Sequence, residues 1–165
     1  MAEIHAAVLT VSDRSFAGTR EDFSGPAIID LLKTQGIELT HYSIVPDDRE
    51  SIISQLSDWI NEGSSNIIFT TGGTGFSPHD VTPEATKTII ERETPGISEF
   101  IRARSAEKTP HAILSRAVSG ICKNCLIINL PGSPKAACES VQFIFPVLPH
   151  AIELLLDQPD SEKNH

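Results

Sequence analysis

Polar and glycine residues follow four β-rich runs of the sequence, at the points where those runs end. The four segments are Thr10–Asp13, Val45–Asp48, Thr70–Gly75 and Asn129–Pro134. In an open parallel sheet, ligands bind in the crevice beyond the carboxyl ends of the strands. If these runs are parallel neighbours, the four segments form one site, and their side chains indicate what that site binds.

The third segment contains Gly72, Gly73, Thr74 and Gly75 directly after an apolar run. Because glycines lack a Cβ atom, their backbone approaches a phosphate closely and turns its N–H groups inward. The segment matches neither the P-loop nor the dinucleotide fingerprint. On these residues alone, an anion cradle and a tight structural turn both stay open.

Two aspartates, Asp47 and Asp80, fall within or just beyond these segments, which brings two carboxylates to the same end of the predicted sheet. Bare carboxylates repel a polyphosphate, but they suit Mg²⁺, which prefers oxygen ligands and keeps waters beside substrate phosphates. The pair therefore predicts a magnesium site for a phosphate substrate. The structural alternatives are a turn or helix cap for Asp47 and an Asx turn ahead of Thr82 for Asp80.

Hydroxyl and cationic side chains add hydrogen-bonding groups to the predicted site. They are Ser12, Thr74, Ser115, Ser133, Arg116 and Lys135. No histidine has an evident serine or cysteine partner with a third orienting group, which argues against covalent hydrolase chemistry.

The alternation of β-rich runs with amphipathic stretches predicts an α/β protein, with three α/β/α layers around a mostly parallel central sheet. Strands are predicted over residues 5–11, 37–45, 66–71, 111–114, 117–121 and 126–130. Helices are predicted over residues 26–35, 49–62, 83–93 and 97–106, followed by two short C-terminal helices split at Pro146. We expect Pro26 to be the first residue of its helix, Asp48 and Thr82 to be N-caps, and Gly36 and Gly63 to end helices. Residues 1–157 form a single domain in this prediction, with a polar C-terminal tail over 158–165.

The charge of the chain narrows the class of protein. Thirteen basic and 22 acidic residues give a formal net charge of −9, the wrong sign for broad contact with a nucleic-acid backbone or an anionic membrane surface. No run approaches the roughly 18 apolar residues of a membrane span, and the N-terminus lacks the pattern of a signal peptide. We therefore expect a cytoplasmic protein without nucleic-acid or membrane partners.

Three cysteines fit a reducing compartment, because a chain of 165 residues does not need disulfides to be stable. Cys122 and Cys125 form a C-x-x-C, but an apolar run follows it, whereas a thioredoxin-like pair opens a helix. A zinc site would need two further ligands, and Cys138 with a scattered histidine is a poor supply. The favoured interpretation is ordinary reduced cysteines beside a strand.

The run TTGGTGFSPHDVTPEAT, residues 70–86, is more specific than its glycines alone. It closely resembles the signature of the Mog/MoaB family, which includes the molybdopterin adenylyltransferases and the corresponding domains of gephyrin and its plant counterpart. The resemblance continues through LTVSD at 9–13, VPDD at 45–48, ERETPG at 91–96, LSR at 114–116 and LIINLPGSP at 126–134. It therefore spans almost the whole chain in order.

This resemblance implies a three-layer α/β fold, commonly a homotrimer, that uses Mg²⁺ and ATP to convert molybdopterin to adenylyl-molybdopterin with release of pyrophosphate. The aspartates that are essential in the family correspond to Asp47 and Asp80, which are implied to be catalytic and to hold magnesium. The implied binding pocket for substrate and nucleotide is lined by Ser12, Asp13, Gly72, Gly73, Thr74, Gly75, Ser115, Pro131, Gly132 and Ser133. A separate molybdenum insertase is an implied partner.

Two other functions and one departure from the family stay open. A molybdopterin-binding paralogue without adenylyltransferase activity is the closest alternative, although the retained Asp47 and Asp80 argue against it. A scaffold role is more distant, because we expect no second domain for this chain to connect. His79 stands where most relatives carry arginine, and a neutral histidine offers phosphate one hydrogen bond and no charge, where arginine forks two. Either His79 contacts substrate and weakens binding, or it only supports the loop.

Overall fold

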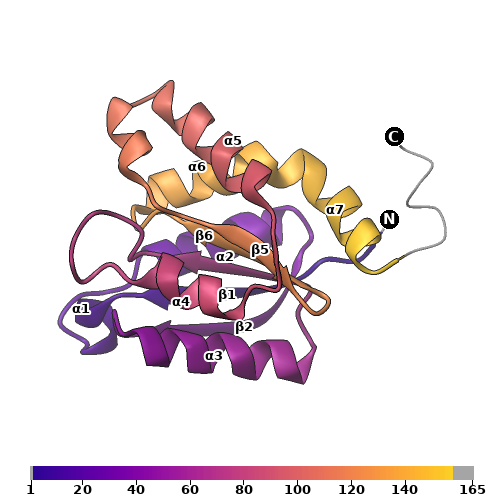
Figure 1. Cartoon of the computed structure of the whole chain (residues 1–165), viewed down its shortest axis with the longest axis horizontal. Helices are drawn as coiled ribbons and strands as arrows, with labels where there is room; N and C mark the ends of the chain where they lie inside the picture. Colours follow the sequence, from indigo (N-terminus) through magenta and orange to yellow (C-terminus); the bar gives the residue numbers. More distant parts are fainter. Residues whose placement is uncertain (1, 158–165) are drawn as a thin grey trace.

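The computed structural model describes residues 2–157, which form a six-stranded sheet with helices on both faces (Figure 1). Its strands are β1 (His5–Val11), β2 (Glu38–Val45), β3 (Ile67–Thr71), β4 (Arg92–Glu93), β5 (Ser119–Cys122) and β6 (Cys125–Leu130), in the spatial order β2-β1-β3-β6-β5-β4. Strands β1, β2, β3 and β6 are parallel, whereas β5 runs antiparallel to β6 and β4 antiparallel to β5. The predicted layered fold with a mostly parallel sheet is confirmed. The predicted polar tail, 158–165, lies outside the described residues.

Side chains of the central strands alternate between the two faces of the sheet, so each strand contributes to two apolar clusters. In β1, Ala6 and Val8 belong to one cluster and Ala7 and Leu9 to the other. The first cluster is covered by α2 (Ser24–Thr34), α5 (Pro95–Ala106), α6 (Pro134–Ile144) and α7 (Leu148–Leu155), and the second by α3 (Arg49–Glu62) and α4 (Thr82–Ile89). Figure 1 shows α3 below the sheet and α5, α6 and α7 above it. The near-continuous apolar composition of the strands follows from this double cover.

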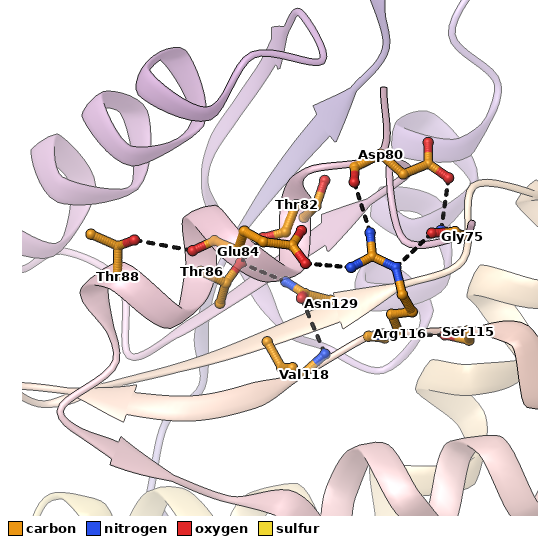
Figure 2. Close-up of polar contacts among 11 residues, drawn as sticks. Gly75, Asp80, Thr82, Glu84, Thr86, Thr88, Ser115, Arg116, Val118 and Asn129 are labelled. Atoms are coloured by element: carbon orange, nitrogen blue, oxygen red, sulfur yellow. Dashed lines mark hydrogen bonds and ion pairs between the residues drawn. The ribbon is translucent and has the colours of Figure 1, made fainter. Parts of the chain in front are cut away.

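Asn129 places a polar group in the middle of this apolar sheet. Its side chain is fully buried, and its amide nitrogen donates to the hydroxyls of Thr70 and Thr86, each at 2.9 Å. Its side-chain oxygen accepts from the Val118 N–H at 3.2 Å (Figure 2). The asparagine therefore ties β6 to β3, to α4 and to the segment that leads into β5.

Several predicted helix ends are confirmed. Asp48 caps α3 by accepting from the Ser51 N–H at 2.8 Å, and Gly63 ends that helix with a φ of +76°. Gly36 follows α2 with a φ of +72°. The predicted split of the C-terminal helices at Pro146 is also confirmed, because a 3₁₀ turn over Phe145–Val147 separates α6 from α7.

Two predicted helix starts are wrong. Helix α2 begins at Ser24 and not at Pro26, because the carboxylate of Asp22 accepts from the N–H groups of Ser24 and Gly25. Thr82 is the first residue of α4 and not its cap, since its hydroxyl donates to the Gly72 carbonyl at 2.9 Å. A short helix, α1 (Asp13–Phe16), was not predicted.

The predicted strand at 111–114 is wrong, and the predicted helix at 83–93 extends too far at its C-terminal end. Pro110–Leu114 is a 3₁₀ helix, η1, in which the Ala112 N–H donates to the Thr109 carbonyl. Helix α4 ends at Ile89 because the chain then becomes extended, and the Glu91 N–H donates to the Ile121 carbonyl at 2.9 Å. The next residues pair with β5 as β4, so tertiary pairing overrides the local helical pattern.

The C-x-x-C lies at the turn between β5 and β6, as the interpretation of ordinary cysteines requires. Cys122 and Cys125 are paired across this hairpin, are buried and are free thiols. Burial raises the pKa of the Cys125 thiol to about 12, so this thiol is unreactive at neutral pH. Among the described residues, no helix has both the length and the apolar character needed to cross a membrane.

The Asn129 contacts generate a prediction about stability. We expect Asn129→Ala to lower the free energy of unfolding by about 2–4 kcal/mol, because the Val118 N–H and two buried hydroxyls lose their partner. Urea denaturation followed by circular dichroism measures this change. The control is Asn61→Ala, at an exposed site, which we expect to change stability by no more than about 0.5 kcal/mol. Equal losses in both variants would contradict a structural role for Asn129.

Candidate active site

The strand order reverses between β1 and β3, because the chain leaves β1 toward β2 on one side and later returns to form β3 on the other. Ligands of open α/β sheets bind at this kind of reversal, beyond the carboxyl ends of the strands. A cavity of about 740 Å³ opens there, and the loops after β1, β2, β3 and β6 all contribute to its wall. The four predicted strand-end segments therefore do meet at one place.

A second cavity of about 450 Å³ lies on the other side of the glycine loop, against α5, η1 and α6. The two cavities share Gly73, Asp80 and Gly132 in their walls. The second cavity has a more apolar lining, to which Ile101 and Leu114 contribute. Two cavities with a common wall fit two ligands that meet at that wall.

Every residue of the pocket that the resemblance implies lines one of these cavities, whereas the predicted cations Arg116 and Lys135 line neither. The larger cavity contains Ser12, Asp13, Asp47, Gly72, Gly73, Asp80, Gly132 and Ser133. The smaller cavity contains Gly73, Thr74, Gly75, Asp80, Ser115, Pro131 and Gly132. The structure therefore brings these residues together, and their individual roles are proposals.

The glycine loop has a backbone that only glycine accommodates well. Gly72 has a φ of +101°, and a Cβ atom there would collide with the carbonyl oxygen of Val11. Gly73 has a φ of +66°, and its Cβ position lies 3.1 Å from the carboxylate of Asp47. In the described part of the chain, the N–H groups of Gly73 and Thr74 donate no hydrogen bond. These two N–H groups are available to an anion.

Arg116 fixes the far side of this loop (Figure 2). Its guanidinium donates to the carbonyl oxygens of Gly75 at 2.8 Å and Asp80 at 2.7 Å, and it forms an ion pair with Glu84. The Asp80 carboxylate in turn accepts from the Gly75 N–H at 2.9 Å. Asp80 is therefore held in position at both its main chain and its side chain.

Asp47 and Asp13 hold each other through reciprocal hydrogen bonds. The Asp13 N–H donates to the Asp47 carboxylate at 3.0 Å, and the Asp47 N–H donates to the Asp13 carboxylate at 2.8 Å. Burial raises the pKa of Asp47 above its ordinary value, and the charges of Asp13 and Asp80 act in the same direction. The Asp13 N–H and the nearby His79 oppose this rise. The Asp47 carboxylate is thus partly buried beside two further carboxylates, a surrounding in which a bound cation would stabilise its charged form.

The predicted hydroxyl groups position backbone at the cavity walls. Ser12 caps α1 by accepting from the Ser15 N–H at 3.2 Å, and Ser133 caps α6 by accepting from the Ala136 N–H at 3.4 Å. Ser115, at the smaller cavity, accepts from the Ala117 N–H at 3.2 Å. Each hydroxyl retains its own proton to donate to a ligand.

Asp22 and the loop that it anchors also line the larger cavity, although they were not predicted to belong to the site. The Asp22 carboxylate accepts from the hydroxyls of Thr10 at 2.6 Å and Tyr42 at 2.5 Å, as well as from the two N–H groups at the start of α2. Burial, followed by the hydrogen bond and charge of Asp22, raises the pKa of Tyr42 well above its ordinary value. An aspartate two residues before a helix start is a recognisable capping pattern, and it could have located this residue.

The fold and the site define an α/β protein with a glycine-lined crevice and several carboxylates at the ends of its parallel strands. The family model described as "Probable molybdopterin binding domain" matches residues 7–150, and the chain belongs to this family.

Relatives of this chain carry related names. It is 42% identical to the molybdopterin adenylyltransferase of Helicobacter pylori strain J99, over 94% of this chain and 90% of that protein. It is 44% identical to the molybdenum cofactor synthesis protein cinnamon of Drosophila melanogaster, over 95% of this chain but 26% of cinnamon. The chain therefore spans about a quarter of cinnamon's length. The structure of the molybdopterin biosynthesis enzyme MoaB of Thermus thermophilus matches with a TM-score of 0.88 and 44% identity, over 94% of this chain and 98% of that one.

The glycine loop generates a prediction that separates backbone strain from close contact. We expect Gly72→Ala to destabilise the fold by more than the about 1–2 kcal/mol of a left-handed alanine, because its Cβ atom also collides with the Val11 carbonyl. The matched control is Gly36→Ala, at a φ of +72° with no atom within 4 Å of the Cβ position. Urea denaturation compares the two variants. A Gly72→Ala protein as stable as Gly36→Ala would contradict the close contact at the site.

Proposed function

We propose that this chain is a molybdopterin adenylyltransferase of molybdenum cofactor biosynthesis, which transfers the adenylyl group of Mg-ATP to molybdopterin and releases pyrophosphate. The observation that carries the proposal is the pair of cavities that share Gly73, Asp80 and Gly132, with Asp47 in the wall of the larger one. Such a transfer needs two substrates whose phosphates meet. Relatives named molybdopterin adenylyltransferase, aligned over most of their length, support it.

The lining of each cavity favours a different substrate. The larger cavity, with its carboxylates and the available Gly73 N–H group in its wall, suits the triphosphate and its metal ion. The smaller cavity, with apolar walls and the Ser115 hydroxyl, suits the flat pterin ring. We therefore assign ATP to the larger cavity and molybdopterin to the smaller one, with the reacting phosphates at the common wall.

The reaction is a direct transfer between these phosphates. A terminal phosphate oxygen of molybdopterin attacks the α-phosphorus of ATP, the bond to the bridging oxygen breaks, and the electron pair leaves with pyrophosphate. The N–H groups of Gly73 and Thr74 stabilise the charge on the transferred group. Asp47 and Asp80 would hold Mg²⁺ or its waters, and the ion supplies charge neutralisation for the triphosphate. The raised pKa of Asp47 beside two further carboxylates fits this assignment.

We also infer the assembly, compartment and partner of the enzyme: a homotrimer in the cytoplasm that works with a molybdenum insertase. Support for the insertase comes from cinnamon and from the gephyrin of Dictyostelium discoideum, in each of which a segment like this chain makes up about a quarter of a longer protein. Free cysteines agree with a reducing compartment.

One incubation tests the proposal against the binding paralogue. Purified protein is mixed with molybdopterin and Mg-ATP, and adenylylated pterin is sought by mass spectrometry together with released pyrophosphate. Formation of both products supports the transferase. Pterin binding without either product would identify the chain as a paralogue that has lost the activity.

We expect Asp80→Asn and Asp47→Asn each to abolish turnover in a folded protein, because a neutral amide supplies no charge to the metal. Product formation is measured by mass. The control is Asp58→Asn, which removes the same charge from an exposed position on α3 and should leave turnover unchanged. Near-normal activity in either site variant would overturn the assignment of that residue.

Asp47→Asn also separates catalysis from stability. The raised pKa of Asp47 means that its ionised form is less favourable in the folded than in the unfolded chain, so at neutral pH its charge costs stability. We therefore expect the inactive Asp47→Asn protein to be at least as stable as wild type in urea at pH 7. Below the raised pKa the wild-type carboxyl is protonated, and the difference should shrink. A clear loss of stability at pH 7 would contradict this account.

His79 lines the larger cavity near Asp47, which favours contact with substrate over a purely supporting role. An arginine at this position would supply a permanent positive charge and paired N–H donors for phosphate. We therefore expect His79→Arg to tighten ATP binding by about 1 kcal/mol. Isothermal titration of ATP into both proteins measures this change. Equal affinity of wild type and His79→Arg would leave His79 as a loop residue only.

A further inference from the structure

Two arginines in the wall of the larger cavity have no role in the site as described so far. Arg14 lies in α1 and Arg20 in the loop that follows it, and both are exposed. In the described part of the chain, neither guanidinium forms a hydrogen bond or an ion pair. By contrast, the guanidinium groups of Arg102, Arg104 and Arg116 are all bonded to the protein.

Hydrogen bonds to a single carbonyl oxygen join the start and the end of the loop that carries these arginines. The carbonyl oxygen of Arg14 accepts from the Thr19 N–H at 3.0 Å, from the Thr19 hydroxyl at 3.2 Å and from the Arg20 N–H at 3.3 Å. The main chains of Arg14 and Arg20 are therefore adjacent. Two positive side chains start from neighbouring points, at the same cavity.

Both ends of this loop are fixed to the sheet. Its start is capped by the Ser12 hydroxyl, and its end is held by Asp22, whose carboxylate accepts four hydrogen bonds from β1, β2 and α2. The charge of Asp22 is thus taken up by its own donors. Asp13 is engaged with the Asp47 N–H, which leaves Glu21 as the exposed acid of the loop at the cavity. The two arginines are not paired with either aspartate.

We infer that Arg14 and Arg20 bind the β- and γ-phosphates of ATP and then the pyrophosphate that leaves. This inference rests on the proposed adenylyl transfer. A guanidinium presents paired N–H donors that match phosphate oxygens, and two unpaired cations in a chain of net charge −9 fit an anion of high charge density. The α-phosphate lies at the common wall near Gly73, and the remainder of the triphosphate extends toward the loop. The arginines thereby orient the leaving group and stabilise the charge that it acquires when the bond breaks.

The test uses inorganic tripolyphosphate with Mg²⁺ as the probe, and isothermal titration measures its binding. We expect Arg14→Ala and Arg20→Ala each to weaken binding about tenfold, the loss of roughly one charge-assisted contact. The matched control is Arg92→Ala, since Arg92 is exposed on β4 and lines neither cavity. It removes the same net charge and should change affinity less than about twofold. Arg14→Lys and Arg20→Lys should restore part of the loss, because they restore the charge without the paired donors.

A second readout excludes a merely structural effect of the substitutions. If the arginines contact phosphate, each alanine variant should show a weaker dependence of affinity on salt, and Glu21→Gln should bind tripolyphosphate at least as tightly as wild type. In turnover assays, the KM for ATP should rise while the KM for molybdopterin stays unchanged. Wild-type affinity for tripolyphosphate in both alanine variants would overturn the inference.

The two proposals fail in different ways. Arginine-dependent binding of tripolyphosphate without any adenylylated pterin would leave the arginine site standing and remove the transferase assignment. Turnover in wild type with an unchanged KM for ATP in both alanine variants would support the transferase assignment and remove the arginine site.

Discussion

Gly72 lies so close to the end of β1 that a Cβ atom on it would collide with the Val11 carbonyl oxygen. Gly132, in the loop after β6, approaches the same glycine, because a Cβ atom on Gly132 would lie 3.4 Å from the Gly72 Cα. The site depends on this close approach, because the lack of side chains lets three strand-end loops converge. The hydroxyl of Thr71 donates to the Pro131 carbonyl at 2.6 Å, and that of Ser24 donates to the Gly132 carbonyl at 2.5 Å, so the convergence is held by hydrogen bonds on both sides. The part of the common wall that Gly73 and Gly132 form is thus backbone, which presents N–H groups where bulkier residues would present side chains.

The carboxylates in and beside this wall repel one another, and hydrogen bonds within the protein offset this repulsion only in part. Asp13, Asp47 and Asp80 each accept a main-chain N–H, which stabilises a carboxylate, yet the pKa of Asp47 is still raised. Residues that serve stability alone would not be left in this state, since a neutral side chain would accept the same N–H group without the repulsion. The arrangement has a physical reason if a cation binds to these carboxylates together with a phosphate. The cation then neutralises the charge of both the carboxylates and the phosphate.

The layers and the meeting of the strand-end loops could be predicted because they follow from short-range patterns, namely apolar runs, capping residues and glycines at strand ends. The strand β4 could not, because Arg92–Glu93 follows a helical pattern and becomes extended only through pairing with β5, which is distant in sequence. Thr82 was predicted to cap α4 because threonine is a common N-cap residue. In the structure its hydroxyl instead donates to the Gly72 carbonyl oxygen in the glycine loop. Asp47 and Asp80 could be placed at the crevice from the sequence because they follow strand ends and glycines, whereas Arg14 and Arg20 in a polar loop give no such signal. The role proposed for these arginines depends on the lack of bonded partners for their guanidinium groups among the described residues, which only the folded chain displays.

The same two arginines bear on the histidine at position 79. The family resemblance implies an arginine at the position of His79 in most relatives, and compared with such an arginine the larger cavity has one permanent positive charge fewer. Arg14 and Arg20 line that cavity together with His79, so permanent positive charge is still available in its wall. A polyphosphate carries charge along its whole length and tolerates such a shift in the position of its counter-charges, whereas a single phosphate would not. The departure at His79 is therefore compatible with a nucleotide triphosphate in the larger cavity, and it would be harder to reconcile with a monophosphate there.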